Sequence, residues 1–293
     1  MTTPDRAHAF GDDALGDADA TGLAELVRTK QVSAAEACEA AVRRAQAMQP
    51  LVNAVECTDY DRALASAEDT RNGPFTGVPT FVKDNVDVAG LPTNHGTDAF
   101  VAAPAAHDSA VVEQLKAQGL NVLGKSRLPE FGFSASTEYM RRDPVRNPWH
   151  RGFSAGASSG GAAALVASGV VPIAHANDGG GSIRIPAAAC GLVGLKVTRD
   201  RNPNLPDGFD YALGNVVDHV VTRTVRDSAA MLDATGYPEP GSSYPAPPKD
   251  RPYIEEVERS PGKLRIAWSS ETPSGRPIEP EIQAALERTA ALL

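Results

Sequence analysis

The chain has 293 residues, a formal net charge of -9 and 42% hydrophobic residues. This length and hydrophobic content are enough to bury one large or two modest domain cores. The acidic balance argues against nucleic acid as a partner, because phosphate binding relies on clustered Lys and Arg. The sequence has no apolar run of about 18 residues, and its polar start lacks a signal-peptide core, so we expect a cytoplasmic protein without a membrane partner.

Helical and strand patterns alternate along the chain. Helices are expected over 21–29, 33–48, 59–69, 109–118, 159–168 and 279–293, and strands over 52–57, 79–83, 120–123 and 264–268. The second helix begins with a predicted capping box, in which Ser33 is the N-cap and Glu36 its partner. Repeated helix and strand alternation with short connections predicts an α/β fold, with a mixed β-sheet flanked by helices.

The sequence is expected to divide into three segments. Residues 1–235 form the expected core, 236–262 form a Pro-rich crossover, and 263–293 form the start of a further, C-terminal part. The last predicted helix keeps an apolar face at helical spacing, and neither glycine nor proline follows to end it. We therefore expect that the C-terminal part of the fold is missing from this chain.

Two serines and one lysine are the strongest candidates for catalysis. Ser158 and Ser182 lie on loops of small residues, and Lys83 ends a short β-branched and aromatic run that predicts a buried strand. A serine hydroxyl needs a base within hydrogen-bond reach, and a desolvated lysine can supply one because burial disfavours its charged form. The alternative is a lysine that is solvated or that pairs with a carboxylate such as Asp84.

Three glycines, Gly179, Gly180 and Gly181, come directly before Ser182. Their N–H groups have no side chains to shield them and can converge on one oxygen, as an oxyanion hole requires. A flexible turn is the alternative. The segment lies between apolar runs and contains Asp178 and Arg184, which we expect to brace the loop rather than to act on substrate.

The cysteines and histidines show no pattern of a metal or cofactor site. Cys38, Cys57 and Cys190 fit no metal-ligand spacing, so we predict reduced, packed thiols and no metal or cofactor. A single histidine, His175, precedes the glycines, and a structural or pocket-lining role is favoured for it.

Three stretches together carry a resemblance to the amidase signature family. They are the Gly/Ser-rich loop 156–161, the Asp-Gly-Gly-Gly-Ser-Ile-Arg segment 178–184 and the Cys-Gly-Leu-Val-Gly-Leu-Lys segment 190–196, with Lys83 upstream at the family's spacing. The resemblance covers residues 23–235 and implies the amidase signature fold. Members of this family are commonly much longer than this chain.

The resemblance assigns roles to the candidate residues. It implies that Ser182 is the nucleophile, that Ser158 relays the proton, and that Lys83 is the base. It also implies a cis peptide bond between Ala157 and Ser158. The N–H groups of Gly179 to Ser182 would form the oxyanion hole. The implied reaction is hydrolysis of a carboxamide C–N bond through an acyl-enzyme.

The residues around the motif indicate a branch of the family and the partners to expect. With His175, Asn177 and Ile185 at these positions, the sequence around the motif resembles the branch that hydrolyses small or cyclic amides, including 6-aminohexanoate cyclic dimer hydrolase-like members. The expected partner is a small-molecule amide, with a homodimer or a complementing C-terminal chain left open. The alternative function is a non-catalytic fragment, or one subunit of a split amidase or amidotransferase-like complex that needs a partner chain.

Overall fold

A computed structural model of the chain describes residues 5–202, 214–237, 246–272 and 274–293. The chain divides into two compact units, one up to Val257 and a smaller one from Glu258 to Leu293. Part of the predicted Pro-rich crossover, including Pro238, Pro240 and Pro245, lies outside the described residues. The three-segment division proposed from the sequence stays a prediction.

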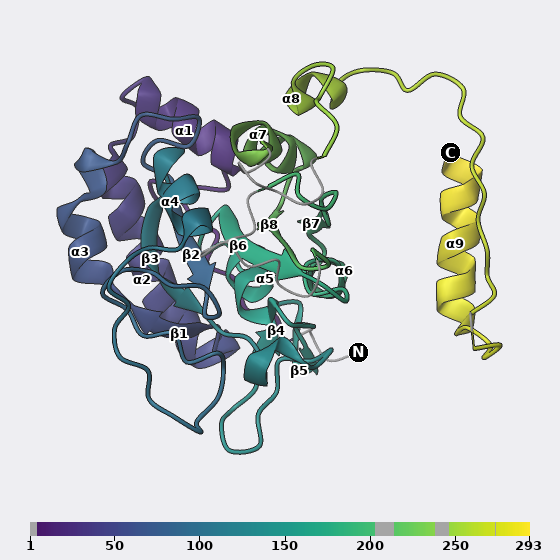
Figure 1. Ribbon diagram of the computed structural model, residues 1–293, viewed down its shortest axis with the longest axis horizontal. Helices are drawn as coiled ribbons and strands as arrows, with labels where there is room; N and C mark the ends of the chain where they lie inside the picture. Colours follow the sequence, from purple (N-terminus) through teal and green to yellow (C-terminus); the bar gives the residue numbers. More distant parts are fainter. Residues whose placement is uncertain (1–4, 203–213, 238–245, 273) are drawn as a thin grey trace. The chain divides into compact units, whose positions relative to one another are not determined.

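Helices and strands alternate through the first unit, as predicted (Figure 1). In chain order the first half contains α1 (Ala20–Arg28), α2 (Ala34–Val52), β1 (Val55–Thr58), α3 (Tyr60–Ala65), the 3-10 turn η1 (Ala67–Asp69), β2 (Pro79–Lys83), α4 (Ala110–Ala117), β3 (Asn121–Ser126) and the 3-10 turn η2 (Glu130–Gly132). The second half contains β4 (Arg146–Asn147), β5 (His150–Ser154), α5 (Gly160–Ala167), β6 (Ile173–Asp178), α6 (Arg184–Cys190), β7 (Val193–Gly194), β8 (Val217–Thr222), α7 (Val225–Thr235) and α8 (Tyr253–Glu256).

The predicted capping box at the start of α2 is confirmed. Ser33 Oγ accepts a hydrogen bond from the Glu36 N–H at 3.1 Å, and the Ser33 N–H donates to Glu36 Oε2 at 2.8 Å. Each partner satisfies an N–H group that the first turn of a helix leaves unpaired. The local sequence therefore fixes where this long helix begins.

The strands of the first unit form small sheets. One has the order β1-β3-β2, with β2 parallel and β1 antiparallel to β3, and another is the antiparallel sheet β6-β8-β7. Strands β4 and β5 form a short antiparallel pair. The predicted α/β class with mixed strand directions is confirmed, although no continuous ladder joins the two three-stranded sheets.

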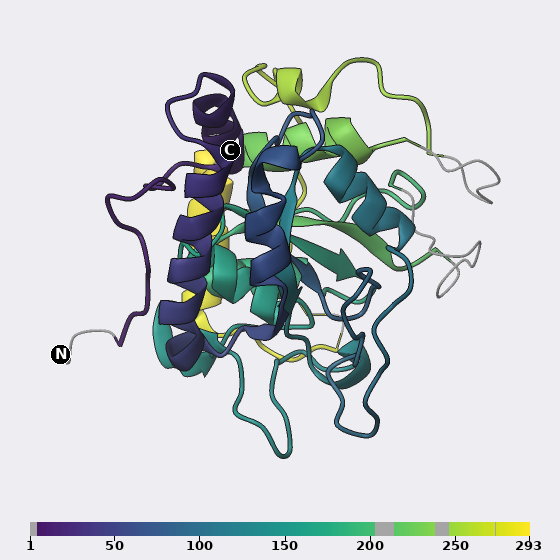
Figure 2. The same ribbon diagram turned by 90° about the vertical axis from the view of Figure 1, so that its left-hand side faces the viewer.

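The two three-stranded sheets meet where β2 lies against β6, at the centre of the unit (Figures 1 and 2). Thr80 Oγ1 donates to the Ile173 carbonyl at 3.0 Å, and further along both strands Lys83 contacts Asn177. The two strands therefore run in the same direction, and α5 packs on both. This arrangement places the ends of β2 and β6 side by side, with Phe81 and Leu165 in the core.

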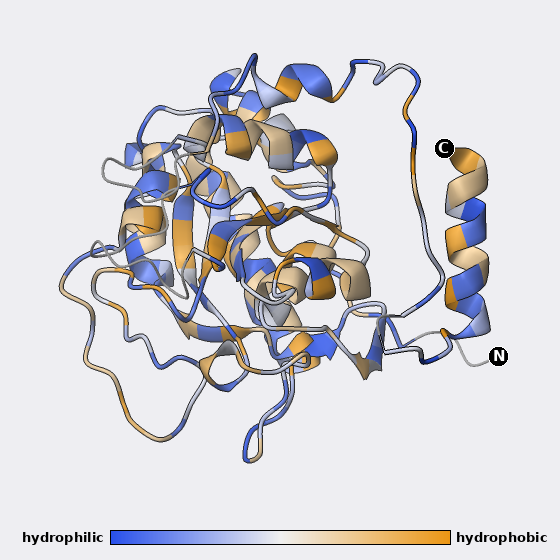
Figure 3. Ribbon diagram, turned by 45° about the vertical axis from the view of Figure 1, so that its right-hand side comes forward, coloured by the Kyte–Doolittle hydropathy of each residue, from blue (hydrophilic) through white to orange (hydrophobic). Residues whose placement is uncertain are grey.

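The second unit contains α9 (Pro280–Leu292), which confirms the helix predicted over 279–293. Figure 3 shows hydrophilic and hydrophobic residues alternating along it. The strand predicted over 264–268 is wrong, because this segment has no regular secondary structure. Its alternating pattern is typical of a strand, but a strand also needs a neighbouring strand to pair its backbone groups, and none pairs with it among the described residues. No helix in the described part of the chain is long and apolar enough to cross a membrane.

Candidate active site

The side chain of Lys83 is wholly buried at the end of β2. Its Nζ lies 2.7 Å from Ser158 Oγ and 2.7 Å from Asn177 Oδ1. Burial lowers the pKa of Lys83 to about 7, although the charges of Asp218 and Asp178 act in the opposite direction. The described residues include no carboxylate within ion-pair distance of Nζ, so this amine is poised to be neutral near neutral pH.

The neighbouring carboxylate, Asp84, has a different partner. Its Oδ1 lies 2.7 Å from Nζ of Lys125 on β3, and both side chains are wholly buried. Lys125 also donates to the Pro92 carbonyl and to Thr93 Oγ1. The structure therefore separates Asp84 from Lys83, against the alternative that the two pair.

Two asparagine amides orient Lys83. Asn177 Oδ1 accepts from Asn85 Nδ2 at 3.3 Å, and Asn177 Nδ2 donates to Asn85 Oδ1 at 3.2 Å. This reciprocal pair fixes the Asn177 amide with its oxygen toward Lys83 Nζ. An amide oxygen can only accept, so one N–H of Lys83 points at Asn177, and a neutral amine can turn its lone pair toward Ser158.

Ser158 lies between Lys83 and the pocket, and only 3% of it is exposed. The Ala157–Ser158 peptide bond is cis, as the resemblance implied. Gly132, whose φ is +75°, packs against this serine: a Cβ there would lie 3.2 Å from Ser158 Oγ. A residue with a side chain is disfavoured at position 132 both by this φ and by the close approach.

The loop that carries Ser182 is held from behind by Asp178. This buried carboxylate accepts hydrogen bonds from the N–H groups of Gly181 (2.7 Å), Ile183 (3.1 Å) and Arg184 (3.3 Å), and from the Arg184 guanidinium at 2.9 and 3.0 Å. Burial by itself raises the pKa of Asp178, but the hydrogen bonds from Arg184 and the backbone outweigh it and lower the pKa to about 2. The carboxylate therefore stays ionised and braces the turn.

Both serines open into one pocket of about 690 Å³. The loops are joined by a hydrogen bond from the Ser159 N–H to the Ser182 carbonyl at 3.2 Å. Among the described residues, no hydrogen-bond partner engages the Ser182 hydroxyl or the N–H groups of Gly179 and Gly180. None of the described side chains that line the pocket is charged at neutral pH. The lining residues are Asn85, Phe131, Gly132, Phe133, Ser134, Ala135, Ser158, Asn177, Gly179, Gly180, Ser182, Ile185, Asn215 and Val216.

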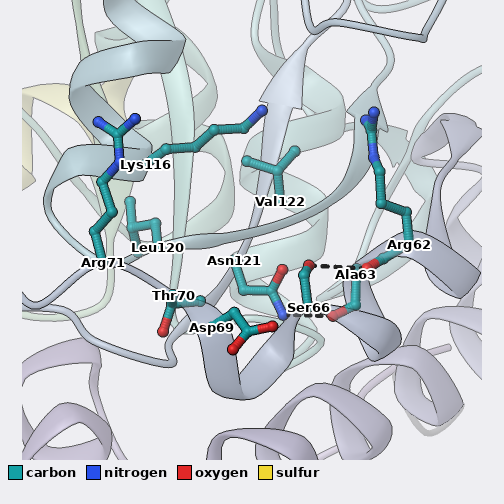
Figure 4. Close-up of a pocket in the computed structure, with 10 residues that line it drawn as sticks. All are labelled: Arg62, Ala63, Ser66, Asp69, Thr70, Arg71, Lys116, Leu120, Asn121 and Val122. Carbon is teal, nitrogen blue, oxygen red and sulfur yellow. Dashed lines mark hydrogen bonds between the residues drawn. The ribbon is translucent and has the colours of Figure 1, made fainter.

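A second pocket, of about 300 Å³, lies beside α3 and has a basic lining (Figure 4). Its cations include Arg62, which forms an ion pair with Asp59, and Lys116, which forms one with Asp108. The serine in this pocket, Ser66, donates its hydroxyl hydrogen to the Arg62 carbonyl at 2.8 Å and has no amine or imidazole as a hydrogen-bond partner. Among its described lining residues, this pocket has no serine hydroxyl hydrogen-bonded to an amine, as Ser158 is to Lys83 in the first pocket.

Sequence reasoning named three candidate residues of the site and missed much of their surroundings. It named Lys83, Ser158 and Ser182 but gave no role to Asn85 or Gly132. Asn85 comes two residues after Lys83 at the polar end of a buried strand, a position that could have singled it out. The segment around Gly132 has no motif, so only the folded chain shows that it packs against Ser158.

The cysteine that begins the 190–196 motif segment has an unreactive thiol because it is buried. Cys190 is wholly buried at the end of α6, and burial raises the pKa of its thiol to about 12. A thiol with such a pKa stays protonated at neutral pH and is a poor nucleophile. Its placement agrees with the packed, reduced cysteine expected from the sequence.

Comparison with known proteins places the chain in a family. The Amidase family profile matches residues 36–293. The chain is 54% identical to the putative amidase AmiC of Mycobacterium tuberculosis over 77% of this chain and 48% of that protein, and 39% identical to 6-aminohexanoate-cyclic-dimer hydrolase of Paenarthrobacter ureafaciens over 94% and 57%.

A solved structure of 6-aminohexanoate cyclic dimer hydrolase superposes with a TM-score of 0.88 at 38% identity, over 96% of this chain and 59% of that one. The chain therefore spans about half to three fifths of the length of these relatives. The match to the family profile covers most of the chain, and these relatives share well over 30% of their residues with it. The chain belongs to the amidase signature family.

Proposed function

We propose that this protein is an amidohydrolase that cleaves a carboxamide C–N bond through an acyl-enzyme on Ser182. The observation that carries the proposal is the wholly buried Lys83 amine, 2.7 Å from Ser158 Oγ and without a carboxylate partner among the described residues. Burying an amine is costly unless its charge is paired or lost. A neutral lysine beside a serine is the arrangement that a proton relay needs.

In the proposed acylation, the lone pair of Lys83 Nζ takes the proton of Ser158 while Ser158 Oγ takes the proton of Ser182. Ser182 Oγ then forms a bond to the carbonyl carbon, and the carbonyl π electrons move onto oxygen. When this tetrahedral intermediate collapses, the C–N bond breaks and the proton returns from Lys83 through Ser158 to the leaving nitrogen. Water repeats the sequence on the ester, which releases the carboxylic acid and restores Ser182.

The backbone before Ser182 is suited to hold the developing oxyanion. The N–H groups of Gly179, Gly180 and Ser182 have no protein partner among the described residues, and all three residues line the pocket. The N–H of Gly181, the fourth expected donor, is engaged by Asp178. We assign the oxyanion hole mainly to the three open donors, because preorganised N–H groups stabilise negative charge without reorganisation.

The proposed substrate is a small, uncharged amide. The described residues of the pocket wall include Phe131, Phe133 and Ile185 together with neutral polar groups, and none of these described residues has a side chain that would pair with a charged substrate. An unpaired charge in such a site would lose hydration without compensation. The relative named 6-aminohexanoate-cyclic-dimer hydrolase supports a cyclic amide as the first substrate to test.

The test compares Ser182→Ala with Ser134→Ala, a matched variant of another serine that lines the pocket. We expect a fluorophosphonate probe to label the parent and Ser134→Ala at Ser182, located by peptide mass spectrometry, and to leave Ser182→Ala unlabelled. Hydrolysis of the cyclic dimer of 6-aminohexanoate should follow the same order. A parent that takes up no probe would contradict the proposal and favour a fragment that needs a partner chain. Labelling at Ser158 would instead reverse the roles of the two serines.

A further inference from the structure

A wholly buried imidazole, that of His175, contacts the main chain of Lys83 and does not line the pocket. Nδ1 of His175 accepts a hydrogen bond from the main-chain N–H of Lys83 at 3.2 Å, and its Nε2 lies 2.9 Å from Asp218 Oδ1. His175 is 0% exposed and Asp218 only 6% exposed. Neither residue lines the pocket or contacts a serine hydroxyl, so the proposed relay does not use them.

These two contacts define the tautomer of His175. A main-chain N–H can only donate, so Nδ1 must carry a lone pair, and the hydrogen of a neutral ring is then on Nε2. Nε2–H therefore donates to Asp218. The carboxylate keeps the ring in the one tautomer that can hold the Lys83 backbone.

Strand pairing explains why these groups meet. In the antiparallel ladder of β6 and β8, His175 is opposite Val220 and Asn177 is opposite Asp218, so the side chains of His175, Asn177 and Asp218 share one face. That face is directed at β2, which has no backbone ladder with β6. The imidazole accepts a hydrogen bond from the Lys83 N–H between β2 and β6, in the place that a backbone carbonyl would take in a continuous sheet.

We infer that His175 is a positioning residue which, together with Asp218, fixes the main chain of Lys83 while Asn177 fixes its amine. The inference rests on the proposed function, because it concerns the lysine that acts there as the base. Lys83 is then held from β6 at both ends, at its backbone N–H and at Nζ. The hydrogen bond from the main chain of Lys83 to His175 limits how far Nζ can move from Ser158. Small displacements of catalytic groups slow a reaction strongly, and a shift of about 1 Å can lower its rate by about 10²-fold.

Two isosteric variants separate the two contacts of the ring. In His175→Asn the side-chain oxygen takes the place of Nδ1 and can still accept from the Lys83 N–H, while the contact with Asp218 is lost. In His175→Gln the side-chain NH₂ takes the place of Nε2–H and can still donate to Asp218, while the acceptor for Lys83 is lost. Thr80→Val is the control, because it removes a different hydrogen bond between β2 and β6, from Thr80 Oγ1 to the Ile173 carbonyl, and leaves both contacts of His175 in place.

The first readout is amide hydrogen exchange at Lys83 by NMR, which needs no activity. A lost hydrogen bond contributes about 0.5–1.5 kcal/mol, so we expect roughly 2- to 13-fold faster exchange in His175→Gln and parent-like exchange in His175→Asn and Thr80→Val. The second readout is the rate at which a fluorophosphonate acylates Ser182. This rate should fall by about 10- to 100-fold in His175→Gln and change much less in His175→Asn. The KM for amide hydrolysis should also change much less than the acylation rate.

Equal exchange in the two His175 variants, or parent-like acylation in His175→Gln, would overturn the inference. A parent that is not acylated at all contradicts the proposed function, whereas the exchange data still decide whether His175 holds Lys83. If both His175 variants unfold, the comparison moves to Asp218→Asn, which keeps an oxygen acceptor for Nε2–H, and Asp218→Leu, which does not. Faster Lys83 exchange in the leucine variant alone supports the inference, and equal exchange in both contradicts it.

Discussion

Lys83 and Lys125 lie on adjacent strands and are both wholly buried, yet their surroundings differ in one respect. Lys125 has a carboxylate, Asp84, 2.7 Å from its Nζ, together with the Thr93 hydroxyl and a backbone carbonyl. Among the described residues, Lys83 has only neutral oxygens, those of Ser158 and Asn177, at the same distance. One buried lysine is therefore part of an ion pair, whereas the other has no counter-ion in the described part of the chain.

The difference gives the two buried lysines different protonation chemistry, which the proposed function uses at Lys83. A buried ammonium with a paired carboxylate has little reason to lose its proton. A buried ammonium without one is destabilised, and burial lowers the pKa of Lys83 to about 7. With no counter-ion for Lys83 among the described residues, its amine can be neutral near pH 7, as the proposed base role requires.

The largest expected effect comes from Lys83→Arg. Arginine keeps the positive charge but cannot lose its proton in proteins, so it cannot act as the base. We expect the rate of amide hydrolysis, or of probe acylation at Ser182, to fall by about 10²–10⁴-fold, nearly as far as in Lys83→Ala. Lys125→Arg is the matched control, since arginine can still pair with Asp84. If Lys83→Arg and the parent react at comparable rates with unchanged circular dichroism, Lys83 is not the base.

The second prediction concerns stability, and here the substitution of Lys125 should have a larger effect than that of Lys83. Removing one partner of a buried ion pair leaves an uncompensated charge, so Lys125→Met should lower the free energy of unfolding by about 3–5 kcal/mol. Lys83→Met removes a buried amine that has no carboxylate partner, so we expect stability equal to or above that of the parent at pH 7, with activity lost. Urea denaturation measures both. A larger loss of stability in Lys83→Met than in Lys125→Met would contradict the distinction between the two sites.

The two lysines also mark the limit of what the sequence could predict. The strand over 79–83 and its buried terminal lysine were predicted correctly, because hydrophobic residues in a short β-branched run need no distant information. The partner of Asp84 was not predictable. Lys125 reaches it only through the parallel pairing of β2 with β3, which sets Lys83 opposite Ser126 and brings distant residues together. The sequence alone left open which lysine the carboxylate pairs with.

The same limit applies to the candidate site and to residues 264–268: local motifs were predictable from the sequence, and contacts between distant residues were not. Motif spacing placed Lys83, Ser158 and Ser182 together, whereas Asn85, Gly132 and His175 act through contacts with residues far along the chain. The strand predicted over 264–268 was wrong for a related reason. An alternating pattern shows that a segment is suited to be a strand, but a strand also needs a partner strand. Among the described residues, none pairs with 264–268.

The smallest expected effect comes from giving Lys83 the kind of neighbour that Lys125 has. The proposed relay needs a neutral amine, so the parent's rate should fall about tenfold per pH unit below the Lys83 pKa of about 7 and level off above it. In Asn177→Asp a carboxylate would replace the amide oxygen 2.7 Å from Nζ. Its charge adds to those of Asp178 and Asp218, which already favour the ammonium, and an adjacent opposite charge typically moves a pKa by about 1–3 units.

The midpoint of the acid limb should therefore move to higher pH in Asn177→Asp, with much of the parent's rate recovered in alkaline buffer. Asn215→Asp is the control, because Asn215 lines the pocket without a hydrogen bond to Lys83 and should move the midpoint less. The measurement is the pH dependence of Ser182 acylation in all three proteins, with circular dichroism at each end of the range. A midpoint that stays in place in Asn177→Asp would mean that the limb does not report on Lys83, and the contrast between the two lysines would then have no consequence for the reaction.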